Sequence, residues 1–174
     1  SPQSLIDTNF SAANSYCKAV LCLLAYQEPK DFQDNGKVIL DNSWLKVASS
    51  RNYHHFFPKA YLKNKTVLNS NSLMNITFVS NHLNKRKIGA KAPSVYIANF
   101  QDENSQIEKA LQTHFINLDG FGIESDDYDT FLNARARIIY KELKSRIELS
   151  HKESFKEEVE ELILGGESDS VEFK

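Results

Sequence analysis

The residues best suited to chemistry lie in one stretch, positions 52–87, which contains a His pair, several asparagines and a basic cluster. Hydrolysis of a phosphodiester needs a base that activates water, a cation that neutralises charge on the phosphate, and contacts that hold the strand. Histidine is the side chain that most readily takes up a proton near neutral pH. We therefore interpret the stretch around His54 and His55 as the active site of a metal-dependent nuclease.

The charged residues are distributed unevenly along the chain. The net charge of −2 alone argues against a nucleic-acid binder. However, positions 42–101 carry nine basic and no acidic residues, whereas the rest of the chain carries 12 basic and all 23 acidic residues. Such a segment attracts a polyanion, although chance clustering on a solvated surface is the alternative. The predicted phosphate contacts, which supply affinity without sequence preference, are Lys59, Lys63, Lys65, Lys85, Arg86 and Lys87.

Two strands and a helix must position these groups. The aromatic run that ends at His55 favours a strand, which Pro58 prevents from continuing as a central strand. After a turn or loop, residues 74–79 predict a second strand, and residues 80–86 predict the start of a helix capped by Ser80 or Asn81. The result is a compact ββα unit.

Neighbouring residues on a regular strand point to opposite faces. His54 and His55 therefore share one site only if the strand is distorted or ends there. Two alternatives stay open: one histidine is catalytic while the other packs or bonds to a carbonyl group, or neither histidine is functional.

The segments HHFFPKAYL and NSLMNITFVSNHLNKRK resemble the HNH endonucleases, also called His-Me finger or ββα-metal nucleases. The closest likeness is to the C-terminal HNH domain of GmrSD-type modification-dependent restriction proteins, and FLNARARIIYKEL resembles the helix that follows in that family. The resemblance implies a metal-dependent DNA endonuclease in a prokaryotic restriction or anti-phage defence protein. It also implies an upstream ParB-like nucleotide-hydrolysing domain in the full-length protein.

Carried over residue by residue, the resemblance implies that His55 is the general base and that Asn75 orients the His55 loop or ring. Asn84 and His54 would bind the metal, although His54 stands where the superfamily often has an acidic ligand. The implied cofactor is a divalent ion, Mg²⁺ or Mn²⁺. Zn²⁺ and Ni²⁺ are alternatives, because imidazole suits Mn²⁺, Ni²⁺ and Zn²⁺ better than it suits Mg²⁺.

The rest of the chain predicts helical scaffold. A helix is expected from Asn9, capped by Asn9 or Ser11, to Pro29, and a long helix is expected after a cap at Asp129 or Thr130. Residues 151–164 predict a further helix. The basic residues of the long helix favour a solvated face, with contact of one or two of them to a DNA phosphate as the alternative; they are Arg135, Arg137, Lys141, Lys144 and Arg146.

The predicted fold class is α+β, with a mostly helical domain, residues 1–164, wrapped around a ββα-metal (HNH) core. Residues 165–174 are expected to be a linker and the truncated start of a following domain, because GESDSVEFK resembles the opening of the Alba-like domain of Schlafen-type proteins. Two rival functions are a non-cleaving nucleic-acid-binding module that keeps the HNH fold and a purely structural or oligomerising domain.

The expected compartment is the cytoplasm, with no membrane partner. No apolar run reaches the roughly 18 residues that span a bilayer, and no signal-peptide pattern precedes the first helix. Cys17 and Cys22 are predicted to be buried free thiols, which fits a reducing compartment.

Overall fold

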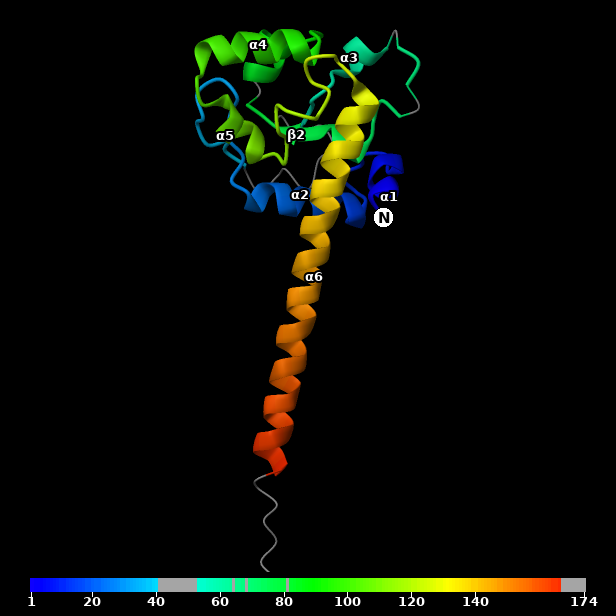
Figure 1. The fold of residues 1–174 in the computed structure, drawn as a ribbon, viewed down its shortest axis with the longest axis vertical. Coiled ribbons are helices and arrows are strands. Elements are labelled where there is room, and N and C mark those ends of the chain that lie inside the picture. The colour runs from blue at the N-terminus through cyan, green and yellow to red at the C-terminus, as the bar shows by residue number, and fades with distance from the viewer. Residues whose placement is uncertain (41–52, 64, 68, 81, 167–174) are drawn as a thin grey trace, which may run out of the picture. The chain divides into compact units, whose positions relative to one another are not determined.

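The computed structural model describes residues 1–40, 53–63, 65–67, 69–80 and 82–166 (Figure 1). The chain divides into two compact units, Ser1–Tyr140 and Lys141–Lys174. The first unit contains the predicted site. The described fold is α+β, with many helices and a two-stranded sheet, which confirms the predicted fold class at this level.

The N-terminal part forms two short helices, α1 (Pro2–Asp7) and α2 (Ser15–Tyr26). The predicted cap at Asn9 or Ser11 is wrong, because the Asn14 side chain caps α2 by accepting hydrogen bonds from the backbone N–H groups of its first turn, at 2.8 and 3.1 Å. Asn9 instead forms an isolated antiparallel bridge with Ser72. The segment between α1 and α2 therefore lies against the loop that leads to the second strand.

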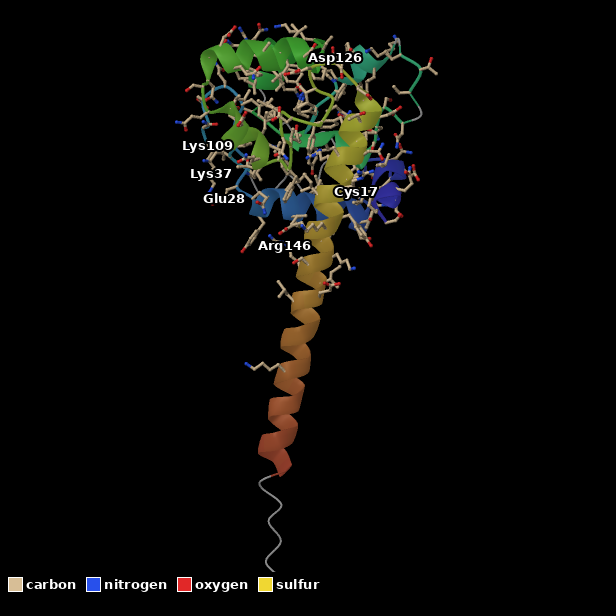
Figure 2. The ribbon with its side chains drawn as sticks, viewed as in Figure 1. Cys17, Glu28, Lys37, Lys109, Asp126 and Arg146 are labelled. Carbon is tan, nitrogen blue, oxygen red and sulfur yellow. The ribbon has the colours of Figure 1, made fainter. Side chains whose placement is uncertain are left out.

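A loop after α2 is closed by a bridge between Lys30 and Lys37 and by an ion pair of 2.6 Å between Lys37 and Glu28. Figure 2 shows Glu28 and Lys37 side by side. The Lys30 carbonyl group in this loop bonds the Nε2 atom of the buried His114 at 2.9 Å. The loop thus covers part of the core.

The predicted pair of strands is present but shorter. β1 (Tyr53–His55) pairs antiparallel with β2 (Ile76–Phe78), so that His54 lies opposite Thr77 and His55 opposite Ile76. Residues 73–75 form a turn of 3₁₀-helix, η1 (Leu73–Asn75), because Ser72 caps it by accepting from the backbone N–H of residue 74. A short helix, α3 (Lys59–Leu62), follows Pro58 and replaces part of the predicted turn or loop.

The helix after β2 begins as predicted with Ser80 as a cap, since its hydroxyl group accepts from the Leu83 N–H at 3.2 Å. Asn81, the other predicted cap, lies outside the described residues. The helix continues as a π-helical turn, η2 (Leu83–Ile88), in which the Gly89 N–H bonds the Asn84 carbonyl group at 2.9 Å. Such wide turns are frequent at functional sites.

The C-terminal half contains α4 (Pro93–Glu103), α5 (Ile107–Gln112) and α6 (Tyr128–Gly166). The Asp127 carboxylate caps α6 by accepting from the Thr130 N–H at 3.0 Å, so the predicted cap at Asp129 or Thr130 is two or three residues too late. The two helices predicted on either side of position 150 are one continuous helix. Residues up to Tyr140 belong to the first unit.

Aromatic residues fill the core behind the strands. Phe56 stacks on Phe131 of α6, with ring centroids 4.6 Å apart and planes 7° apart. Phe57 meets Tyr128 edge-on at 5.2 Å, and the Tyr96 hydroxyl group donates to the Phe56 carbonyl group at 2.7 Å. The two residues that follow His55 are therefore fixed by α4 and α6.

Cys17 is buried as predicted, whereas Cys22 is exposed, so the prediction for Cys22 is wrong. Across the described ranges, no helix combines the length and the apolar character that crossing a membrane requires.

Candidate active site

The His55 ring has a defined tautomer. Its Nε2 atom lies 3.0 Å from Oδ1 of Asn71, and the Nδ2 group of Asn71 donates to the Phe10 carbonyl group at 3.0 Å. Because that donation fixes the orientation of the carboxamide, Oδ1 faces His55 and must accept the Nε2 proton. The Nδ1 atom of neutral His55 then carries the free lone pair.

Burial lowers the pKa of His55, an effect that the bond to Asn71 opposes and that the nearby Lys59 reinforces. The imidazole is therefore neutral near pH 7. A neutral, oriented imidazole is the form that a general base needs.

Asn71 lies in the turn or loop predicted between the two strands, and the sequence did not reveal this contact. The backbone of Asn71 is fixed on both sides, since its carbonyl group accepts from the Phe10 N–H at 2.8 Å and its N–H donates to the Asn69 side chain at 3.0 Å. The turn chemistry was visible in the sequence. The pairing with His55 was not, because it depends on how the N-terminal segment packs.

Asn75 fixes the backbone that follows His55. Its buried side chain accepts from the Phe57 N–H at 2.8 Å and donates to the Phe57 carbonyl group at 2.9 Å. The Asn75 carbonyl group also accepts from the Phe56 N–H at 2.8 Å. Of the two tasks expected for Asn75, the described geometry shows contact with the loop and not with the imidazole ring.

His54 faces Asn84, whose Oδ1 atom lies 3.1 Å from the Nδ1 atom of the imidazole. His54 is only 3% exposed, and its Nε2 atom is buried without a hydrogen-bond partner within the described part of the chain. Burial and the neighbouring His55 lower the pKa of His54 to about 3, against the opposing effect of the bond to Asn84. His54 is therefore neutral at pH 7, which is the form that binds metals.

The His54 and Asn84 donors fit a divalent cation in spacing. Two adjacent ligands of an octahedral ion with bonds of about 2.1 Å are about 3 Å apart. The observed separation of 3.1 Å is that of a hydrogen bond between the two side chains, and it is also compatible with a shared ion. The Nε2 atom, which is buried without a partner, lies on the opposite side of the ring from this pair. No group of three or more His, Cys, Asp or Glu side chains suited to a metal occurs among the residues described. The groups there that could hold a cation are the imidazole of His54 and the carboxamide of Asn84.

The two histidines bond to different partners. His54 contacts Asn84 on η2, whereas His55 contacts Asn71 in the loop before η1. Adjacent residues of β1 thus follow the alternation expected of a strand. The two predicted metal ligands, His54 and Asn84, are therefore in contact with each other. The predicted base, His55, is oriented separately by Asn71.

The predicted phosphate contacts differ in their surroundings. Those with exposed side chains are Lys59, Lys63, Lys65 and Arg86. The Lys65 ammonium group lies 4.4 Å from the centre of the Tyr61 ring, and Lys87 forms an ion pair of 3.0 Å with Glu103. The side chain of Lys85 lies outside the described residues. Lys87 is therefore partly neutralised, whereas the loop lysines keep their charge towards solvent.

Arg135 contradicts the expectation of a solvated or DNA-contacting side chain, because it is fully buried. It shares the core face of α6 with Phe131 and Ile139, at the i, i+4, i+8 spacing of one helix side. This spacing could have indicated that position 135 is buried. The prediction of an exposed side chain followed instead from the positive charge of arginine.

No family model matches the chain, and no solved structure matches it significantly. The uncharacterized protein MJ0686 of Methanocaldococcus jannaschii is 27% identical over 158 residues, in an alignment that covers 76% of this chain and 26% of the relative. The chain therefore spans about a quarter of the length of that curated relative.

Proposed function

We propose that the chain is a metal-dependent DNA endonuclease of the ββα-metal type. The observation that carries the proposal is the pair of contacts made by two asparagines around β1: Asn75 fixes the backbone after His55, and Asn84 contacts His54. The strand order and the helix after β2 also support it. As part of the proposal, the parent protein acts in prokaryotic restriction or anti-phage defence and carries an upstream ParB-like domain.

In the proposed reaction, Nδ1 of His55 takes a proton from a water molecule as the water oxygen attacks phosphorus, and the P–O3′ bond breaks. Burial favours the neutral ring, and the bond from His55 to Asn71 selects the required tautomer. His54 and Asn84 would hold a divalent cation, which would stabilise negative charge on the phosphate and the leaving oxygen. Exposed loop lysines contact neighbouring phosphates without reading sequence.

The second candidate is a nucleic-acid-binding module that does not cleave. The observation that favours it is the neutral donor pair, since His54 and Asn84 offer no carboxylate. Such a module would bind DNA with a steep salt dependence but would not need the His55 tautomer.

A plasmid-nicking assay with parallel DNA retardation at low salt distinguishes these functions. We compare the wild type with His55→Ala and with His82→Ala, because His82 is an exposed imidazole near the helix that carries Asn84. Loss of a general base is expected to slow nicking about 100-fold or more in His55→Ala, with unchanged retardation, while His82→Ala matches the wild type. Binding without metal-dependent nicking in the wild type supports the binding module. Absence of both supports a structural or oligomerising domain.

A further inference from the structure

We propose that Arg135 is a positioning residue for the His55 loop, acting from α6 through the turn that carries Asn75. The proposal deepens the nuclease function above and rests on it for its catalytic consequence. Its structural part concerns contacts within the first unit alone.

The Arg135 guanidinium group binds the backbone on both sides of Asn75. Its Nη1 group donates to the carbonyl groups of Met74 and Ile76, both at 2.7 Å. Met74 lies in η1 and Ile76 opens β2, so one side chain fixes the change from 3₁₀ turn to strand at Asn75. A third bond, from Nε to the His114 carbonyl group at 3.1 Å, fixes the guanidinium group from the other side.

A packing role alone does not require a cation at this position. Arg135 is fully buried, and within the described ranges no carboxylate pairs with it. Burying an unpaired charge is costly, and an apolar side chain would fill the same volume at lower cost. Hydrogen bonds from a charged donor to carbonyl groups are stronger and more directional than neutral ones. The observed arrangement therefore favours a role in fixing geometry.

The contacts form a continuous path to the proposed base. Arg135 fixes the carbonyl groups beside Asn75, and the Asn75 carboxamide binds both backbone groups of Phe57. Phe57 lies two residues after His55, whose ring is oriented separately by Asn71. Loss of the guanidinium group should release Asn75 first and the His55 loop second.

The test uses Arg135→Lys and Arg135→Gln, with Arg137→Lys as the matched control because Arg137 is an exposed arginine on the same helix. Amide hydrogen exchange is measured at a temperature at which each chain stays folded, with the α2 amides as an internal reference. The Phe56 and Phe57 amides, which donate to Asn75, should exchange faster relative to α2 in both Arg135 variants, by about tenfold in Arg135→Gln. The rise should be smaller in Arg135→Lys than in Arg135→Gln, because lysine keeps the positive charge.

The second readout is nicking. Both Arg135 variants should lower the single-turnover rate about tenfold or more with DNA affinity within about twofold of the wild type. An equal rise in exchange at α2 and at Phe57, unchanged protection of Phe57, or failure of both variants to fold would each overturn the proposal, because Arg135 would then be an ordinary core residue. If the wild type does not nick DNA, the proposed function fails, whereas the exchange data still decide the role of Arg135.

Discussion

His55 and Asn71 are joined by a hydrogen bond of 3.0 Å between Nε2 and Oδ1, and this bond determines which nitrogen of the imidazole carries the proton. The carboxamide cannot turn over without losing its own bond to the Phe10 carbonyl group. The N-terminal segment, which looked like simple scaffold in the sequence, thus sets the chemistry of the proposed base.

Replacement of Asn71 by Ala should leave the tautomer and orientation of His55 undefined. The nicking rate is expected to fall about tenfold to a hundredfold, as for outer partners that orient a metal-bound histidine, while DNA retardation stays the same. Single-turnover nicking measures the effect. Asn133→Ala, which removes an exposed carboxamide, is the control and should retain the wild-type rate.

Asn71→Asp tests the same contact through pH. A carboxylate beside His55 favours the imidazolium form and raises the pKa that burial lowers. The acid limb of the pH–rate profile should therefore move to higher pH than in the wild type. An acid limb at the same pH as in the wild type, or at a lower pH, would exclude His55 as the titrating base.

Replacement of Asn75 by Ala should destabilise the fold. The Phe57 N–H and carbonyl groups would lose their partner in a buried environment. We expect a decrease of about 2–4 kcal/mol in the free energy of unfolding, measured by urea denaturation. Asn133→Ala should lower it by less than about 1 kcal/mol because its contact is exposed.

His114 should make stability depend on pH. Burial lowers its folded-state pKa to about 3, from an ordinary value of 6.5, so the unfolded chain binds more protons between these values. The contribution of His114 to the free energy of unfolding is therefore fully present above about pH 6.5. It decreases as the pH falls towards 3, by about 1.4 kcal/mol per pH unit in the lower part of this range. His114→Gln keeps a donor for the Lys30 carbonyl group. It should reduce the slope of the free energy of unfolding against pH by the amount that one bound proton contributes. His82→Gln, at an exposed position, should leave the slope unchanged.

The metal preference follows from the donor pair. Activity should be abolished by a chelator and be at least as high with Mn²⁺ as with Mg²⁺, because an imidazole is one of the two donors. Asn84→Asp should increase Mg²⁺ affinity about tenfold, measured by calorimetry without DNA. Asn99→Asp adds the same charge at an exposed position of α4 and should not increase it. Strict dependence on Mg²⁺ would count against His54 as a ligand.

The loop lysines should determine the salt dependence of DNA binding. Lys63→Gln and Lys65→Gln are each expected to lower the slope of log affinity against log salt by about one unit. Lys87→Gln should have a smaller effect because Lys87 already pairs with Glu103. Lys109→Gln, on an exposed face of α5, is the control. Equal slopes in all four variants would show that the loop does not contact phosphate.

Local patterns in the sequence were sufficient for several elements. The aromatic run before Pro58 predicted β1, and Ser80 was correctly predicted to cap the helix that carries Asn84. Both signals operate within a few residues. The start of α2 was misplaced at Asn9 or Ser11, because those residues also have side chains that can cap a helix. The structure instead uses Asn14 as the cap and pairs Asn9 with Ser72.

By itself, the sequence determined the residue types available for chemistry and the ββα order that brings Asn84 close to His54. Tertiary structure alone decided the orientation of His55 and the burial of Arg135. The physical reason is that the bond from Asn71 to Phe10 spans 61 residues and those from Arg135 to Met74 and Ile76 span 61 and 59, and no local propensity or periodicity specifies partners so far apart along the chain.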